Sequence, residues 1–581
     1  MFKYGKITVG FLLLVFLSAT TQDSPKFSPK LQRFIGAQPV SESISAWIFL
    51  ADKGKSLSKK LHSAEETLTP NAYQRRLRNR GLYNLVDEFD IPVNGDYFRE
   101  IQQRVLKVRH KSRWLNAVSV EATAGMLTGI AALPFVAKID LVFKTNLPAP
   151  APLEEISFPG KQSLNKSFTL DYGESFTQNN MINVPLLHDS GLSGEGVIIA
   201  MLDAGFNNLQ HEALDHLDIL ATRDFVNNDA NVDDEPGQAG SGSHGTYTLS
   251  VIGGFQEGRL IGPAYGATFI LAKTENTASE RNVEEDNWIA AAEWADSLGA
   301  DIISSSVGYS DFDSGQRSYT PENMDGQTAI VTIGAELAAS RGILVVNSAG
   351  NEGSNVSPGG NTLVAPGDGA NVLTVGAVGS TGLRASFSSI GPTADGRIKP
   401  DVAAMGAAVF MASASNTSNY ITRNGTSFSC PLTAGSAALI LEANPGSTNQ
   451  QIISALKETA NNAQNPDNFL GWGIIDAIAA SNLIGSGSIL PPVSDELEVL
   501  QNFPNPFNGS TTFQYSLPQP GNVKAAVYNI RGQKVQTLLN RFQSSGTRTM
   551  IWNPENISSG IYIIVVAANG KVAGQKVVYV R

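Results

Sequence analysis

Short apolar runs alternate with helical patterns in the largest part of the chain, residues 170–485. The helical spacing covers two stretches, 287–298 and 328–340. Strands that read as continuous apolar runs are usually buried on both faces, as in a parallel sheet covered by helices. The alternation predicts an α/β domain with a parallel sheet flanked by helices. Its strand candidates are 197–202, 269–272, 301–304, 343–346 and 372–375.

The patterns on either side of this region are different. Residues 30–146 combine strand candidates at 44–50 and 134–143 with a basic helical stretch, which predicts a small α+β domain. Residues 497–581 hold short strand candidates separated by Pro, Gly and Asn, as in a small β-sandwich. Linkers rich in small residues and proline lie near 148–166 and 485–496. The strand candidates of the last segment are 511–515, 523–528, 547–552, 560–566 and 575–580.

The first 21 residues have the pattern of a secretory signal peptide. A basic start precedes an apolar run from Ile7 to Leu17 and then small residues. The run is too short to span a membrane comfortably, although a membrane anchor or a buried helix is the alternative. No other stretch is long and apolar enough, so we expect no transmembrane segment in the mature chain.

Composition narrows the possible classes of function. The 581 residues include 42 basic and 53 acidic side chains, a formal net charge of −11. This acidic balance argues against nucleic acid as a partner. The single cysteine, Cys430, excludes internal disulfides, so an exported chain must rely on its packed core.

Basic residues gather in the segment before the α/β region. Taken alone they could bind a polyanion. The alternatives are a solvated helix face, or a face docked on the acidic remainder of the chain. The residues are Arg75, Arg76, Arg78, Arg80, Arg104, Lys107, Arg109, Lys111 and Arg113.

Three short motifs in the α/β region hold residues suited to nucleophilic catalysis. Asp203 follows an apolar strand and precedes Gly205, a position at the carboxyl edge of a parallel sheet. His244 is followed by Gly and Thr at the expected start of a helix. Ser427 follows Gly425, and Pro431 fits only the first turn of the helix that would begin there.

Together the three side chains have the chemistry of a serine nucleophile. Serine needs a base to take its proton, histidine can do so near neutral pH, and a buried aspartate orients the imidazole. Asn351, after the strand candidate 343–346, could donate a hydrogen bond to an oxyanion. Each residue alone is more often structural: Asp203 as a turn former, His244 as a packed histidine, Asn351 as part of a Gly-flanked turn.

The order of these motifs resembles the subtilisin family of serine peptidases. The matching stretches are Asp203-Ala-Gly, His244-Gly-Thr, Ala349-Gly-Asn and Gly425-Thr-Ser-Phe-Ser-Cys-Pro. The resemblance implies a secreted serine endopeptidase that needs no cofactor for catalysis and acts on proteins or peptides. It also implies that an extended substrate pairs with the segment Ser306, Val307 and Gly308, with Ala349 and Gly350 on the opposite side.

The departures from the family pattern are modest. Ala204 stands where Ser or Thr is usual, Tyr247 replaces a frequent histidine, and Phe428 to Cys430 replace Met-Ala-x. None removes a catalytic atom. Cys430 is expected to be a small buried residue and not a second nucleophile.

The flanking segments also resemble known modules. Residues 30–146 are similar in position and pattern to the inhibitory propeptides of subtilisin-like enzymes. The stretches Asn505-Pro-Phe-Asn and Gly560-Ile-Tyr in residues 497–581 resemble the C-terminal sorting domain of the bacterial type IX secretion system. This implies export through the periplasm of a Gram-negative bacterium to the cell surface or the medium. The alternative is an ordinary β-sandwich accessory domain.

Two acidic groups and two rival functions stay open. The groups could bind a structural calcium ion, but neither has EF-hand spacing, so a solvated loop or a cleft-lining recognition patch is favoured and no metal ligand is assigned. Another acyl hydrolase is disfavoured because Ser427 lacks a Gly-x-Ser-x-Gly elbow. A catalytically dead adhesin would lack a motif residue. The acidic groups are Glu275, Glu280, Glu284, Glu285 and Asp286, and Asp229, Asp233, Asp234 and Glu235.

Overall fold

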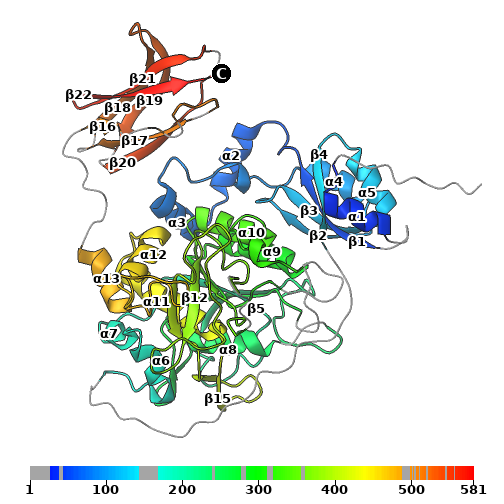
Figure 1. Ribbon diagram of the computed structural model, residues 1–581, viewed down its shortest axis with the longest axis vertical. Coiled ribbons are helices and arrows are strands. Elements are labelled where there is room, and N and C mark those ends of the chain that lie inside the picture. The colour runs from blue at the N-terminus through cyan, green and yellow to red at the C-terminus, as the bar shows by residue number, and fades with distance from the viewer. Residues whose placement is uncertain are drawn as a thin grey trace, which may run out of the picture. The chain divides into compact units, whose positions relative to one another are not determined.

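A computed structural model shows two compact units, Met1–Leu483 and Ile484–Arg581 (Figure 1). The signal-peptide candidate and most of both expected linkers lie outside the described residues. No helix among the described residues is long and apolar enough to cross a membrane. The structure describes residues 26–37, 43–142, 168–238, 242–276, 283–310, 318–354, 360–486, 497–499, 502, 505–509, 511–517, 521–543, 546–554 and 557–580.

A seven-stranded parallel sheet forms the centre of the first unit, which confirms the predicted α/β class. The strand order reverses between β5 and β10, and such a switch point opens a crevice at the carboxyl ends of the strands. In spatial order the strands are β13 (Val402–Met405), β12 (Leu373–Val378), β11 (Leu344–Ser348), β10 (Ile302–Ser305), β5 (Ile198–Asp203), β9 (Thr268–Lys273) and β6 (Asp218–Asp224).

Helices cover both faces of this sheet. Alternate residues of β5 (Ile198, Ala200 and Leu202) pack in one core with α9 (Val283–Leu298) and α10 (Ile330–Ser340). The intervening residues point to the other face, where α8 (Ser243–Gly253) and α11 (Thr426–Ala443) pack together. Smaller helices complete the domain: α6 (Phe176–Asn180), α7 (Val184–His188), α12 (Asn449–Glu458) and α13 (Ala477–Ser486).

The segment before this domain is an α+β module, as predicted. Its antiparallel sheet has the order β2-β3-β1-β4, with its helices beside it (Figure 1). We refer to residues 30–146 as the prosegment. Its elements are α1 (Pro29–Ala37), β1 (Ile44–Leu50), α2 (Leu57–Glu66), α3 (Pro70–Arg80), α4 (Gly95–Gln102), β2 (Lys107–Ser112), β3 (Ala117–Ala122), α5 (Ala124–Ala131) and β4 (Val136–Val142).

Half of the basic stretch is not helical. Arg75 and its neighbours lie on α3, but Lys107, Arg109 and Lys111 lie on strand β2. A bulge between Val108 and His110 interrupts the alternation of side chains along β2, so Lys107 and Lys111, which pair with Glu121 and Val118, lie on opposite faces of the sheet. The helical interpretation of this half was wrong because Val108 is the one apolar residue of β2, so the strand lacks the apolar alternation by which strands are recognised.

The second unit is a β-sandwich of a three-stranded and a four-stranded antiparallel sheet. Both sheets contribute to one core, for example Tyr515 from the first and Val527 from the second. All five predicted strands are present, and β16 and β19 are additional strands, each at the edge of its sheet. The strands are β16 (Glu498–Val499), β17 (Thr511–Leu517), β18 (Gly521–Asn529), β19 (Lys534–Gln543), β20 (Gly546–Trp552), β21 (Gly560–Ala568) and β22 (Lys571–Tyr579).

Candidate active site

The structure brings Asp203 and His244 into direct contact. Asp203 is the last residue of β5, and His244 is the second residue of α8. Their Oδ1 and Nδ1 atoms are 2.6 Å apart. The other carboxylate oxygen of Asp203 accepts a hydrogen bond from Thr248 Oγ1 at 2.9 Å. Thr248 lies one helical turn after His244, so α8 contacts the aspartate twice, which the sequence motifs did not reveal.

Close backbone packing explains the glycines of these two motifs. Gly205 has φ +126°, a conformation that L side chains rarely adopt. A Cβ atom on Gly245 would lie 2.2 Å from the carbonyl oxygen of Gly205. The turn after Asp203 and the first turn of α8 can therefore touch only if both positions are glycine.

Ser427 lies in the first turn of α11, as predicted, but Pro431 does not. The helix begins at Thr426, which places Pro431 in its second turn. A proline there cannot donate to the carbonyl four residues earlier, which is that of Ser427. Ser306 Oγ donates to this carbonyl at 2.8 Å instead, and Ser427 Oγ donates to the carbonyl of Ser306 at 3.3 Å. The loop after β10 thus replaces the missing helical hydrogen bond.

No hydrogen bond joins Ser427 to His244 in the described structure, although the two motifs are adjacent. The His244 ring centroid is 6.1 Å from that of Phe428, the residue after Ser427. Ser427 Oγ must turn away from the Ser306 carbonyl to reach the imidazole. Catalytic hydrogen bonds are often long or poorly aligned without substrate and tighten in the complex.

Asn351 is fixed by the helix that holds Ser427. Its Oδ1 accepts from the main-chain N–H of Thr426 at 2.9 Å and from Thr426 Oγ1 at 3.1 Å. With Oδ1 held in this way, the Nδ2 group is the part of the amide that can donate elsewhere. This arrangement is what an oxyanion donor requires, because the donor must be in place before charge develops.

The predicted substrate-binding segments lie beside Ser427. Gly350 and Thr426 exchange hydrogen bonds at 3.2 Å in both directions, and Ala349 N–H donates to the carbonyl of Val375 at 3.0 Å. Ser306 follows β10 directly. Among the described residues, no main-chain group bonds the N–H groups from Ser306 to Gly308. These groups are suited to pairing with an extended peptide.

The charges around His244 favour its cationic form. Burial alone would lower the pKa of His244, but the Asp203 carboxylate, its hydrogen bond and the Glu275 carboxylate outweigh burial and raise it. Cys430 is fully buried, as expected, and burial raises the pKa of its thiol to about 12. A thiol in this state is not a nucleophile at neutral pH.

The first acidic group is not a solvated loop. Glu284, Glu285 and Asp286 form the buried first turn of α9, and Glu275 is buried after β9; Glu280 lies outside the described residues. No group of three or more His, Cys, Asp or Glu side chains is arranged to hold a metal ion in the described part of the chain. A structural calcium ion therefore stays an untested prediction.

Asp296 on α9 is the point where the prosegment arginines converge. It pairs with Arg75, with Arg76 at 2.8 Å and with Arg113 at 2.6 Å. Burial alone would raise the pKa of Asp296, but these three cations outweigh it and hold the pKa well below its usual range. The prediction that the basic face docks on the acidic remainder of the chain is confirmed, and the solvated alternative is wrong for Arg75 and Arg76.

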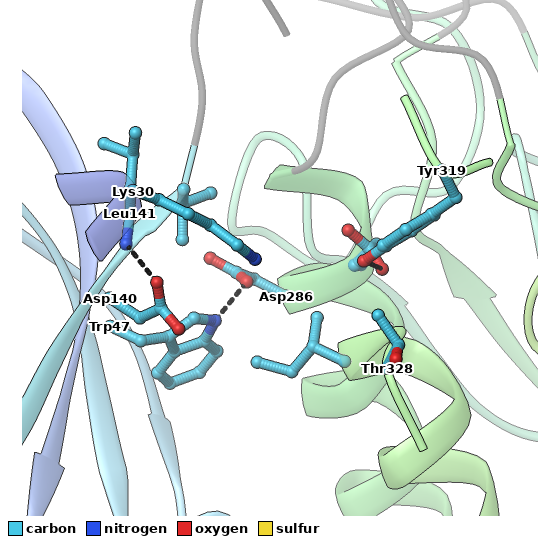
Figure 2. A pocket seen from close by; sticks show the side chains of 10 residues that line it. Lys30, Trp47, Asp140, Leu141, Asp286, Tyr319 and Thr328 are labelled. Carbon is cyan, nitrogen blue, oxygen red and sulfur yellow. Dashed lines mark hydrogen bonds between the residues drawn. The ribbon is translucent and has the colours of Figure 1, made fainter. Parts of the chain in front are cut away.

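A second contact lies at the start of α9. Asp286 accepts from Trp47 Nε1 at 2.5 Å and from Ser119 Oγ at 2.6 Å, both on the prosegment sheet. Figure 2 shows Trp47 and Asp286 at a pocket between the prosegment and the catalytic domain, with Lys30 on the prosegment side. Burial raises the pKa of Asp286 to about 6, and Arg109 and the two hydrogen bonds offset only part of this effect.

The fold and the site define a serine peptidase of the subtilisin type, and comparison with known proteins agrees. Residues 194–473 match the subtilase family of S8 peptidases. Residues 45–155 match the S8 propeptide domain of Bacteroidota, and residues 501–580 match a secretion system C-terminal sorting domain. The two flanking matches point to secretion from a Gram-negative bacterium.

Individual relatives support the same assignment. Subtilisin NAT from Bacillus subtilis subsp. natto is 32% identical over 304 residues, which cover 52% of this chain and 70% of that protein. Serine protease AprX from Bacillus subtilis (strain 168) is 27% identical over 437 residues, 70% of this chain and 89% of AprX. The chain therefore belongs to the subtilase family.

One solved structure supports the fold alone. It is the epidermin leader peptide processing serine protease (EpiP) from Staphylococcus aureus, with a TM-score of 0.52 at 15% identity. The match covers 76% of this chain and all of that one.

Proposed function

We propose that this chain is the precursor of a secreted serine endopeptidase in which Asp203, His244 and Ser427 form the catalytic triad. The observation that carries the proposal is the 2.6 Å contact between Asp203 and His244, with Ser427 in the first turn of the adjacent α11. The substrates are extracellular or surface proteins, which an exported peptidase would meet.

The first half of the reaction forms an acyl-enzyme. His244 Nδ1 is held by Asp203, so its Nε2 takes the proton from Ser427 Oγ as this oxygen attacks the substrate carbonyl carbon. The carbonyl oxygen becomes an oxyanion, to which Asn351 Nδ2 donates. When the intermediate collapses, His244 gives its proton to the leaving amine and the peptide C–N bond breaks.

The second half releases the acid product. Water gives a proton to His244 Nε2 and attacks the acyl carbon, and the proton then returns to Ser427 Oγ as the ester bond breaks. The raised pKa of His244 favours the imidazolium that forms in both halves. Ser306 to Gly308 would pair with the substrate main chain, with Ala349 and Gly350 on the opposite side.

The flanking segments suggest the order of maturation. The prosegment would assist folding and then be cleaved between Lys144 and Leu170. The C-terminal β-sandwich would direct passage through the type IX machinery from the periplasm and then be removed. The enzyme would finally be released or attached at the cell surface.

Labelling with a fluorophosphonate probe tests the proposal, with a Ser427→Ala variant as the control. We expect the wild type to be labelled, and the variant to be unlabelled and to retain the precursor band on the same gel. No labelling of a folded, processed wild type would contradict the peptidase function and favour a scaffold on a peptidase fold.

A further inference from the structure

Glu275 is a buried carboxylate at the edge of the candidate active site. It lies two residues after the end of β9, whose Lys273 is paired in register with Asp203 on β5. Its side chain is only 8% exposed. The main chain just before Glu275 is hydrogen-bonded to that of Asp203, since Thr274 N–H donates to the Asp203 carbonyl at 2.8 Å.

Two hydroxyl groups fix the position of this carboxylate. Thr274 Oγ1 and the Tyr309 hydroxyl each lie 2.7 Å from the same oxygen, Oε1. Tyr309 is fully buried and directly follows Gly308. The carboxylate therefore lies between the strand that ends at Asp203 and the segment that would pair with substrate.

No lysine or arginine among the described residues pairs with Glu275. The charges that act most strongly on it are that of Asp203, which raises its pKa, and that of the His244 imidazolium, which lowers it. Burial raises the pKa of Glu275 to about 7, and its two hydrogen bonds offset only part of this effect. The buried carboxylate of Asp296, by comparison, has three arginine partners.

A substrate can supply the lysine or arginine partner that Glu275 lacks. A buried carboxylate is costly unless it is paired, and a lysine or arginine side chain pairs with it through charge-assisted hydrogen bonds. We propose that Glu275 selects a basic residue of the substrate, close to the scissile bond on the segment that pairs with Ser306 to Gly308. The inference rests on the peptidase function proposed above.

The test compares peptides that differ only in one charge. Quenched fluorescent peptides carry lysine or its uncharged analogue norleucine at each of the four positions before the scissile bond in turn. The enzyme is obtained from the full chain after processing. We expect kcat/KM to favour lysine by at least about tenfold at one position, in line with the coupling energies of close charge pairs. In Glu275→Gln this ratio should fall to near one.

A second variant separates charge from packing. Tyr309→Phe removes one hydrogen bond but leaves the carboxylate in place, so it should keep the preference for lysine. Norleucine peptides report basal activity, and fluorophosphonate labelling reports the nucleophile. Equal cleavage of lysine and norleucine peptides at all four positions, or an unchanged preference in Glu275→Gln, would overturn the inference while leaving the peptidase intact. No labelling and no cleavage of any peptide would overturn both.

Discussion

Ser306 and Ser427 are joined by two reciprocal hydrogen bonds from side chain to main chain. The bond from Ser306 Oγ satisfies the carbonyl that Pro431 leaves without a helical partner. The same contact holds the predicted substrate-binding segment against the helix that presents the proposed nucleophile. The Ser306 hydroxyl group therefore both satisfies the buried carbonyl of Ser427 and fixes the geometry of the candidate active site.

Replacing Ser306 with alanine should lower both stability and activity. A buried carbonyl left unsatisfied typically costs about 1–3 kcal/mol. We expect a loss of this size for the catalytic unit in urea denaturation, together with a lower kcat/KM. Ser436→Ala is the matched control, because Ser436 Oγ donates at 2.9 Å to Leu432, a carbonyl within the regular part of the same helix. Equal stability of the two variants would contradict the role of Ser306.

Asn351→Asp isolates the contribution of the proposed oxyanion donor. Aspartate can still accept from Thr426 N–H, so the local structure should persist, but the donating Nδ2 group is lost. We expect kcat to fall by about 10²–10³, as is typical for the loss of one oxyanion donor. The melting temperature should stay close to that of the wild type. An unchanged kcat would remove Asn351 from the mechanism.

Asp296→Asn should destabilise the precursor strongly. Removing one partner of a buried ion pair typically costs about 3–5 kcal/mol, because the remaining charges stay buried without compensation. Urea denaturation measures this loss in a Ser427→Ala background, which prevents processing. Asp140→Asn is the control: its pair with Lys138 at 2.7 Å is on the surface and should contribute less than about 1 kcal/mol. Similar losses in both variants would contradict the anchoring role of Asp296.

Asp286 should make the precursor less stable as pH rises. Its pKa in the folded precursor is about 6, above the ordinary aspartate value of 3.8, because burial disfavours the charged form. A raised carboxyl pKa means that the folded state binds the proton more tightly, so stability is present below pH 3.8 and is lost as pH rises through 6. Asp286→Asn removes this dependence, so the stability difference between variant and wild type should change in the variant's favour between pH 4 and 7.

His110 acts in the opposite direction. His110 Nε2 lies 2.8 Å from Asn287 Oδ1, and burial lowers the pKa of His110 to about 4. The loss of folding stability that His110 causes therefore grows as pH falls below 6.5. Because His110 is present in both proteins, its effect cancels in the difference between Asp286→Asn and wild type. A difference that does not vary with pH would contradict the assignment to Asp286.

Cys430 should resist thiol reagents in the folded protein. Its thiol is fully buried and its pKa is raised to about 12, so the reactive thiolate is scarce at neutral pH. We expect iodoacetamide to leave fluorophosphonate labelling of Ser427 unchanged, and mass spectrometry to find alkylation only after denaturation. Alkylation of the native enzyme at pH 7 would contradict the buried position.

The elements that the sequence predicted are those with a strong local pattern. Continuous apolar runs located β5, β9, β10, β11 and β12, and helical spacing located α9 and α10. The edge strand β19 was missed because its side chains are mostly exposed or half-buried and lack a clear alternation. The placement of Pro431 was wrong because its tolerance depends on Ser306, which lies 125 residues earlier in the sequence.

The candidate site residues divide in the same way, into those with a local sequence signal and those that depend on distant residues. Motif order singled out Asp203, His244, Ser427 and Asn351 as candidates, because short-range glycine and helix signals accompany them; their catalytic roles stay a prediction. The arginine partners of Asp296 were not foreseen individually, since Arg75 and Asp296 are 221 residues apart and no local rule joins them. The sequence also did not reveal that Glu275 lacks a lysine or arginine partner among the described residues, because the neighbours of a buried side chain depend on three-dimensional packing.

The outer face of α9 is shaped by a segment that the mature enzyme would no longer contain. Asp286 and Asp296 are buried and contact the prosegment directly, and after its removal we expect both carboxylates to be hydrated. Re-docking would require this hydration to be given up again, which favours maturation in one direction. In the mature enzyme, α9 would then still carry the two acidic residues whose partners in the precursor were on the prosegment.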